Sequence, residues 1–323
     1  MKAKFYLLYK LNILQSIVLG IIQGITEFFP ISSSGHLVIF PYFFNWDYIP
    51  LYFTVTVHFA TLAAVVTVFY KEIFRIIRAV ILGIFIRSER SSSNFKLGIL
   101  LIIASIPAVV VGFFLVDYVE SLFSKPVVAA IFLLATALFL WLGEMRGRHI
   151  EAGLTNSQGS PGGKYSSSGS KGDKKSDLIG EIDLTGIGLK KVKFNFFIAA
   201  VTGIGQALAI LPGISRSGTT ISFARFFGVK RSEAVRFSFL LSVPVIIGSF
   251  VFELYQSSSI IFENNTGMIQ NLATGFLSSY LTGLFAVKFI VYMTRKKNLN
   301  VFAIYCICLA AVVFIFFMIK KFI

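Results

Sequence analysis

Two short stretches place serine and threonine hydroxyls beside a charged residue inside apolar segments. Residues 30–36 read Pro-Ile-Ser-Ser-Ser-Gly-His, and residues 212–220 read Pro-Gly-Ile-Ser-Arg-Ser-Gly-Thr-Thr. Proline and glycine interrupt a helix, and the helix that follows presents free backbone N–H groups that suit a phosphate. The two turns therefore predict one shared phosphate site. The hydroxyls that we expect to bind substrate are those of Ser32, Ser34, Ser215, Ser217 and Thr220.

Three residues of the turns have side chains that could act on a bound phosphate. Ser33 carries a hydroxyl at the tip of the first turn, and a serine is a poor nucleophile without a base. His36, three residues later, titrates in a suitable range and could polarise that hydroxyl. Arg216, at the tip of the second turn, demands an anion at membrane depth, and its planar fork matches a phosphate. We expect all three to be catalytic.

Glu27 and Gln23 precede the first turn and lie on one helix face, because they are four residues apart. A carboxylate inside a membrane is expensive and needs a partner or a purpose. The carboxylate and the amide oxygen form a hard-oxygen pair suited to Mg²⁺ or Ca²⁺. The alternative is a structural hydrogen bond between Glu27 and the other turn. His58, in a later apolar segment, faces a helix interior or the rim of the site, and we favour a structural role for it.

The composition indicates an integral membrane protein. Of the 323 residues, 56% are hydrophobic and 14% are charged, whereas a soluble domain carries about 25% charged residues. The net charge of +15 lies between the apolar segments, as in cytoplasmic loops, which argues against a nucleic-acid partner. Six apolar stretches are long enough to span a bilayer, which takes roughly 20 residues. These predicted spans are 50–71, 95–117, 126–144, 231–254, 270–293 and 299–320.

Two further apolar stretches, 5–45 and 193–228, are each broken near the middle by one of the turns. The economical interpretation is a re-entrant helix hairpin, whose irregular backbone must be buried in protein or line a wet cavity. The chain therefore repeats as hairpin and three spans. A shift of 183 positions gives seven identities in the sixteen positions 20–35, clustered at the turn.

Three crossings per half make the repeat inverted, because the second half then starts on the opposite side of the membrane. We predict an all-α integral membrane protein with six transmembrane helices plus two re-entrant hairpins. Its parts are a first repeat at 1–145, a flexible cytoplasmic linker at 146–192 and a second repeat at 193–323. The basic connections at 71–96, 145–193 and 295–297 fall on one side, which we assign to the cytoplasm.

At these residues the sequence closely resembles the undecaprenyl-diphosphatase family, the bacitracin-resistance membrane phosphatases of bacteria. The resemblance is carried by Gln23-Gly-Ile-Thr-Glu27 running into the turn at 30–36, and by the turn at 212–220. It covers nearly the whole chain except about 150–190. It implies hydrolysis of undecaprenyl diphosphate to the monophosphate and inorganic phosphate, which recycles the lipid carrier for cell-wall synthesis.

The resemblance also implies a divalent cation, a place in the bacterial cytoplasmic membrane and an active site open to its outer side. Carried over by position, Ser33 is the nucleophile, His36 the acid or base, and Arg216 the phosphate clamp. Glu27 with Gln23 is the metal or proton partner. Because position 23 is a neutral amide, a tight two-metal site is not expected.

A transporter is the rival interpretation. Inverted repeats with paired hairpins that meet at the midplane suit alternating access, so the same site could carry polyprenyl phosphate across the membrane. A structural scaffold would leave Glu27 and Arg216 unexplained. The expected partners are a polyprenyl diphosphate lipid and membrane lipids, and the sequence leaves open whether the protein is a homo-oligomer.

Overall fold

The computed structural model describes residues 11–46, 49–156, 194–261, 266–296 and 298–322. These ranges contain helices and no strand, which confirms the predicted all-α class. The elements are α2 (Ile13–Phe28), α3 (Ser33–Phe44), α4 (Leu51–Phe85), the 3-10 helix η1 (Arg87–Ser91), α5 (Ser93–Leu122), α6 (Pro126–Asn156), α7 (Phe196–Leu208), α8 (Arg216–Phe226), α9 (Arg231–Ile261), α10 (Thr266–Lys296) and α11 (Asn300–Phe322).

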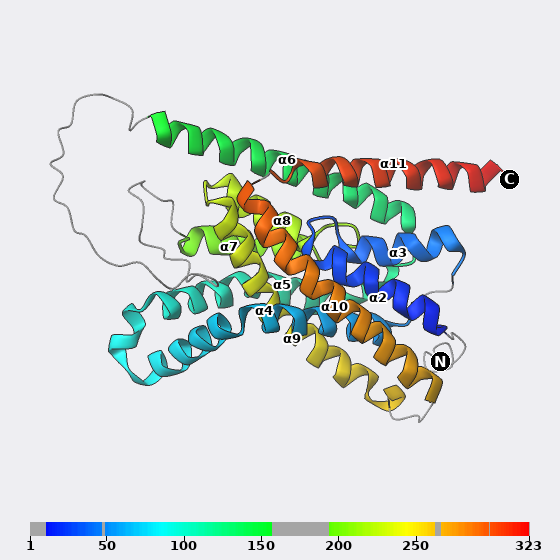
Figure 1. Ribbon diagram of the computed structural model, residues 1–323, viewed down its shortest axis with the longest axis horizontal. Coiled ribbons are helices and arrows are strands. Elements are labelled where there is room, and N and C mark those ends of the chain that lie inside the picture. The colour runs from blue at the N-terminus through cyan, green and yellow to red at the C-terminus, as the bar shows by residue number, and fades with distance from the viewer. Residues whose placement is uncertain (1–10, 47–48, 157–193, 262–265, 297, 323) are drawn as a thin grey trace.

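Six of the described helices, α4, α5, α6, α9, α10 and α11, are long and apolar enough to cross a membrane, as predicted. Between 28% and 56% of the apolar stretch in each is buried inside the protein, so much of the remaining side-chain surface is available to lipid. The other four helices, α2, α3, α7 and α8, are shorter and form the two hairpins around the turns (Figure 1).

Two helices continue beyond the ends that the apolar pattern predicts. The first span was predicted at 50–71, but α4 continues to Phe85, with non-helical backbone angles at Phe69. The predicted linker at 146–192 begins inside α6, which ends at Asn156, and its residues 157–192 lie outside the described part. Hydrophobicity measures only the stretch in lipid, whereas a helix can continue into water on its backbone hydrogen bonds.

The first hairpin packs against the second half of the chain through small residues. On α2, an added Cβ at Gly20 would stand 2.5 Å from the Gly275 carbonyl oxygen of α10, and one at Gly24 would stand 2.5 Å from the Ser279 carbonyl oxygen. Close backbone approach of this kind is typical of helix pairs in membranes. The interface between α2 and α10 is therefore formed by elements of opposite halves.

The second hairpin packs in the corresponding way against the first half. A Cβ at Gly203 of α7 would stand 2.6 Å from the Ala104 carbonyl oxygen of α5, and Gln206 donates a hydrogen bond of 3.2 Å to the same carbonyl. Gly203 and Gln206 are the positions that match Gly20 and Gln23 in the sequence repeat. The two halves thus interlock, each with its hairpin on a helix of the other.

Both arms of the first hairpin end at the same end of the bundle. Before α2 begins, the Leu11 carbonyl accepts a hydrogen bond from Asn271 at the start of α10. At the other arm, Asn45 at the end of α3 accepts a hydrogen bond of 2.5 Å from Lys320 at the end of α11. In Figure 1 these ends lie to the right, whereas η1 and the end of α6 lie to the left.

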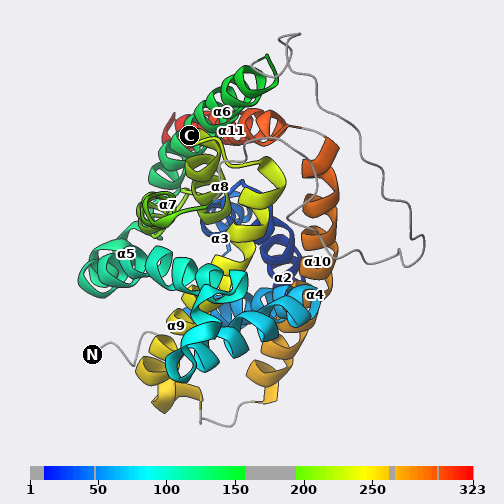
Figure 2. The same cartoon turned by 90° about the vertical axis from the view of Figure 1, so that its left-hand side faces the viewer.

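The arms of the second hairpin end at the opposite end of the bundle. Phe194, before α7, stacks on Phe237 near the start of α9 with ring centroids 4.1 Å apart. Arg225, near the end of α8, bonds to Glu151 near the end of α6 at 2.5 Å. Two hairpins that enter from opposite ends bring their turns together in the middle, as Figures 1 and 2 show for α2, α3, α7 and α8.

Candidate active site

Each of the two turns begins a helix with a capping serine. Ser32 accepts a hydrogen bond from the Gly35 N–H at 3.1 Å, and Ser215 accepts one from the Gly218 N–H at 3.0 Å. Each capping hydroxyl also lies 3.2 Å from the hydroxyl two residues later. Ser32 has a φ of 70°, a left-handed conformation that is rare for serine. Such strain persists only where the surroundings hold it, and it gathers at functional sites.

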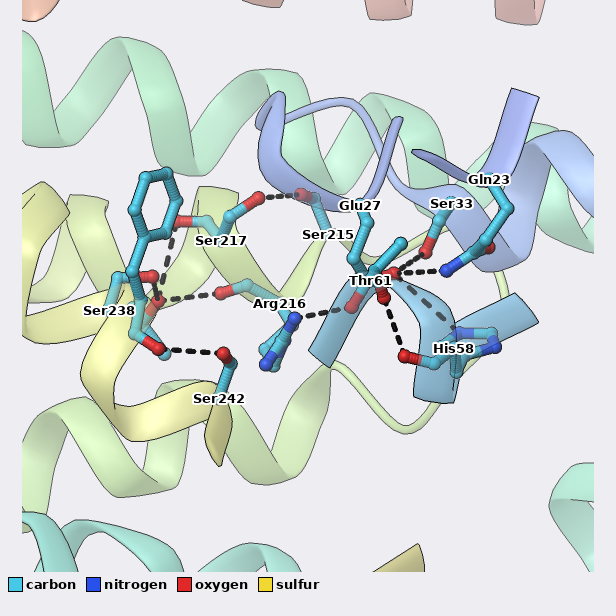
Figure 3. Close-up of polar contacts among 12 residues, drawn as sticks. Gln23, Glu27, Ser33, His58, Thr61, Ser215, Arg216, Ser217, Ser238 and Ser242 are labelled. Carbon is cyan, nitrogen blue, oxygen red and sulfur yellow. Dashed lines mark hydrogen bonds and ion pairs between the residues drawn. The ribbon is translucent and has the colours of Figure 1, made fainter. Parts of the chain in front are cut away.

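Glu27 is the centre of the site and joins the two hairpins. One carboxylate oxygen, Oε1, pairs with Nη2 of Arg216 from the second hairpin. The other, Oε2, accepts hydrogen bonds from the Ser33 hydroxyl at 2.5 Å and from Gln23 Nε2 at 2.8 Å. Only 5% of the Glu27 side chain is exposed, and the ion pair and hydrogen bonds supply the partners that a buried carboxylate needs. The structure thus brings together Gln23, Glu27, Ser33 and Arg216 (Figure 3).

One nitrogen of the Arg216 guanidinium makes no hydrogen bond within the described residues. Its Nη1 is buried and, among the residues that the structure describes, has no hydrogen-bond partner. Leaving a buried guanidinium N–H without a hydrogen-bond acceptor costs free energy. A phosphate oxygen would satisfy it, and Arg216 lies beside the Ser33–Glu27 pair in Figure 3. The arrangement can therefore hold an anion next to a hydroxyl whose proton is already directed at a carboxylate.

His36 lies away from Ser33, with both ring nitrogens engaged elsewhere. Its Nδ1 lies 2.7 Å from the Ser32 carbonyl oxygen, and its Nε2 lies 2.7 Å from the Tyr305 hydroxyl. A carbonyl oxygen can only accept, so Nδ1 carries the proton and Nε2 of the neutral ring accepts from Tyr305. The base role of His36 stays a prediction, and the geometry instead ties it to the turn.

His58 is the residue that the sequence interpretation left out of the site. Its Nε2 lies 3.6 Å from Glu27 Oε2, while its Nδ1 donates to the Thr54 carbonyl oxygen at 2.7 Å. Since Nδ1 donates to the Thr54 carbonyl, Nε2 is the ring nitrogen that lies beside the carboxylate of Glu27. The sequence shows only that Thr54, His58 and Thr61 place polar groups on one face of an apolar helix, and this spacing does not identify Glu27 as the group that His58 meets.

The hydroxyls predicted to bind substrate are used mainly inside the protein. Ser32 and Ser215 are the caps, and Ser34 lies 3.2 Å from the Ser32 hydroxyl. Ser217 donates to the Phe29 carbonyl at 3.2 Å, and Thr220 donates to the Arg216 carbonyl at 2.7 Å. Their substrate contacts stay predictions. Among these hydrogen bonds, that of Ser217 joins the second turn to the first hairpin, and the others lie within their own turn.

The residues around Glu27 fit a cation that is shared with a phosphate ligand. Gln23 Oε1 is buried and has no partner within the described residues, which leaves one hard oxygen free beside a carboxylate. No group of three or more His, Cys, Asp or Glu side chains suited to a metal occurs in the part of the chain that the structure describes. Mg²⁺ is often held by one or two carboxylates plus substrate phosphates and water, which needs no such cage.

Several named proteins are similar to this chain along nearly their whole length. An undecaprenyl-diphosphatase from Desulforapulum autotrophicum is 35% identical over 306 residues, covering 92% of this chain and 95% of the relative. Others come from Christiangramia forsetii, at 36% identity over 94% of this chain and 98% of the relative, and from Korarchaeum cryptofilum, at 34% identity over 92% and 96%.

The family model described as "Bacitracin resistance protein BacA" matches residues 16–312, a range that begins in α2 and ends in α11. Both turns, Glu27 and Arg216 lie inside this range, as do five of the six long apolar helices in full and α11 up to residue 312. The match therefore includes the site as well as the fold, and the chain belongs to the bacitracin resistance protein BacA family.

Proposed function

We propose that this protein hydrolyses undecaprenyl diphosphate to undecaprenyl phosphate and inorganic phosphate. The relatives of this chain are named for that activity. The observation that carries the proposal is the contact of Ser33 and Arg216 with the two oxygens of one buried carboxylate, Glu27, beside the partnerless Nη1 of Arg216. The product is the lipid carrier on which cell-wall precursors are built.

In the proposed first step, the Ser33 Oγ attacks the terminal phosphorus of the diphosphate. The bond between that phosphorus and the bridging oxygen breaks, and undecaprenyl phosphate leaves. The Ser33 proton passes to Glu27 Oε2, the atom to which the hydroxyl already donates at 2.5 Å. Water then attacks the phosphoseryl phosphorus, the bond from that phosphorus to the Ser33 Oγ breaks, and the proton held by Glu27 returns to Ser33. Both protons of the water leave on the inorganic phosphate as H2PO4⁻, and the carboxylate of Glu27 is restored.

Arg216 supplies the charge that this step needs. Its Nη1 binds a phosphate oxygen, while Nη2 remains on Glu27 Oε1. When Glu27 takes the proton of Ser33, its negative charge disappears and more of the positive field of Arg216 acts on the phosphoryl group. A preorganised cation in a water-poor site stabilises developing charge strongly. His58 Nε2, 3.6 Å from Glu27 Oε2, is a second place for the proton.

A divalent cation, Mg²⁺ or Ca²⁺, fits the same site. Glu27 and Gln23 would hold it together with the phosphates of the substrate. When bound, it neutralises phosphate charge and polarises a phosphoryl oxygen. The free Oε1 of Gln23 supports this role.

We further propose that the protein lies in the bacterial cytoplasmic membrane with the site open to the outer side. The basic residues between the spans support this orientation, since positive loops stay in the cytoplasm. They include Lys71, Arg75 and Arg78 in the second part of α4, and Arg146 and Arg148 in the second part of α6. The re-entrant character of the hairpins belongs to the same proposal.

The decisive experiment is phosphate release from undecaprenyl diphosphate by the detergent-solubilised protein. The wild type should release phosphate, and Ser33→Ala should be reduced to background because it has no nucleophile. Ser16→Ala is the control, since its hydroxyl is buried and has no partner in the described residues. Substrate labelled at the terminal phosphate should label Ser33 transiently. Phosphate release by Ser33→Ala at the wild-type rate would refute covalent catalysis.

A carrier of polyprenyl phosphate remains the second candidate, and the interlocked inverted halves favour it. A flipping assay in vesicles reconstituted with Ser33→Ala separates the two functions. Transport of the lipid phosphate by this variant would establish a carrier activity beside the hydrolysis. Its absence would leave the protein as a hydrolase alone.

A further inference from the structure

We propose that Thr136 of α6 is a positioning residue for the reaction, because its hydroxyl holds the backbone of the second turn so that Arg216 meets Glu27. Thr136 is completely buried. Its Oγ1 donates to the Gly213 carbonyl oxygen at 2.9 Å and accepts from the Ser215 N–H at 2.9 Å. The inference rests on the proposed role of Arg216 as the phosphate clamp.

One side chain therefore satisfies two backbone groups of the turn. Gly213 and Ser215 flank Ile214, and Arg216 is the next residue along the chain. At this depth there is no bulk water to replace a lost hydrogen bond, so irregular backbone must find its partners in the protein. A hydroxyl can donate and accept at once, which a methyl group of the same size cannot do.

The turn also presses directly on α6 beside Thr136. Gly213 has a φ of 101°, and a Cβ there would stand 2.2 Å from the Ala129 carbonyl oxygen. On the other side, a Cβ at Gly218 would stand 3.3 Å from the Thr136 methyl group. The turn cannot approach α6 more closely, and the two hydrogen bonds prevent it from moving away.

The face of α6 that carries Thr136 also packs along α8. Ala129, Thr136 and Gly143 are seven residues apart, which returns to nearly the same face after two helical turns. A Cβ at Gly143 would stand 2.7 Å from the Ser222 Cα of α8. One turn further, a Cβ at Gly147 would stand 2.6 Å from the guanidinium carbon of Arg225.

Ion pairs fix the far end of α8 to the same helix. Arg225 is fully buried, bonds to Glu151 at 2.5 Å and lies 3.9 Å from Glu144. Glu144 in turn holds Arg231 at the start of α9 through two hydrogen bonds of 2.7 Å. With α8 held at its C-terminal end by these ion pairs, the hydrogen bonds of Thr136 hold the turn at the N-terminal end, where Arg216 begins the helix.

The test compares kcat and KM for phosphate release by purified variants, normalised to folded protein. Thr136→Val keeps the shape and removes the hydroxyl, so we expect kcat to fall by about 10- to 100-fold, as for small misplacements of a catalytic group. Thr136→Ser restores the hydroxyl and should keep most of the activity. Thr202→Val is the matched control, because Thr202 is also fully buried but its hydroxyl has no partner in the described residues.

A merely structural role would lower the yield of folded Thr136→Val and leave kcat per folded molecule unchanged, and that outcome would overturn the inference. If Thr136→Val does not fold, Gly143→Ala gives a second test, because its Cβ displaces α8 at Ser222. Gly143→Ala should lower kcat, whereas Gly248→Ala should not, since nothing lies within 4 Å of that Cβ. Equal kcat in both glycine variants would also refute the inference.

Arg216→Ala in the same assay separates this inference from the proposed function. Full activity of Arg216→Ala would refute the clamp itself, whatever Thr136→Val does. An inactive Arg216→Ala together with a fully active Thr136→Val would refute only the positioning role of Thr136.

Discussion

Glu27 uses its two oxygens for two different tasks. Oε2 receives the hydroxyl of Ser33 from its own hairpin, while Oε1 receives Nη2 of Arg216 from the other hairpin. The position that matches Glu27 in the second half is Ile210, and the position that matches Arg216 in the first half is Ser33. The repeat is therefore broken at the residues that would do the chemistry, and each hairpin supplies what the other lacks.

Replacing Arg216 by lysine should be severe, although the charge is kept. Lysine is a point charge that cannot hold Glu27 and a phosphate with two separate N–H groups of one plane. We expect Arg216→Lys to lower kcat by about 10²- to 10³-fold, the usual effect of losing one transition-state donor. Initial rates of phosphate release would measure this, with Arg236→Lys as the control, because that arginine pairs with Glu72 away from the site. If kcat falls no more in Arg216→Lys than in Arg236→Lys, then Arg216 contributes only its positive charge.

The sequence correctly predicts which charged residues gather near Ser33, except for the histidine. A spacing of three suggests that His36 faces Ser33, but side chains on a helix lean toward its N-terminus. Ser33, the first residue of α3, accordingly reaches back to Glu27, and His36 reaches back to the Ser32 carbonyl. His58 approaches Glu27 from a separate helix, α4, and no spacing along one segment can reveal such a contact.

Among the elements, helix identity follows from the apolar pattern, whereas partners and ends do not. Six apolar runs became six long helices, but the end of α4 at Phe85 could not be read from hydropathy. The packing partner of α2 could not be predicted either. Gly20 and Gly24 indicate a close helix contact, but they do not show which helix makes it. That information lies in α10, more than two hundred residues away.

Gly24→Ala tests this contact between α2 and α10. The new Cβ would lie 2.0 Å from the Thr282 hydroxyl oxygen and 2.5 Å from the Ser279 carbonyl oxygen, so the helices must separate. We expect a loss of about 1–3 kcal/mol in the free energy of unfolding, the usual range for overpacking. Thermal unfolding in detergent would measure it, with Gly248→Ala in open space as the control. An unchanged midpoint would mean that α10 yields without cost.

For the whole molecule, the repeat is visible in the sequence but its interlocked arrangement is not. The shift of 183 residues identifies two halves, and it does not say that α2 packs on α10 or α7 on α5. The repeats at 1–145 and 193–323 are separate along the sequence, but in the structure the hairpin of each one packs on a helix of the other. The charge pattern adds an orientation, which the arrangement of helix ends agrees with but does not measure.

Cysteine labelling tests that orientation. In a background without Cys306 and Cys308, Ser88→Cys lies exposed in η1 and Ser124→Cys lies exposed between α5 and α6. A membrane-impermeant maleimide added to intact cells, or to spheroplasts where an outer membrane is present, should label Ser124→Cys. It should reach Ser88→Cys only after permeabilisation. The reverse pattern would place the basic connections outside and invert the proposed topology.

The hydrogen bond between His36 and Tyr305 has a counterpart in that of Thr136 with the second turn. In each case the last long helix of one half steadies the turn of the other, α11 for the first turn and α6 for the second. During synthesis, Ser33 therefore enters the membrane long before the helix that steadies its turn has left the ribosome. A nascent chain that stops after α10 would carry Ser33, Glu27 and Arg216, yet its first turn would lack the support of α11.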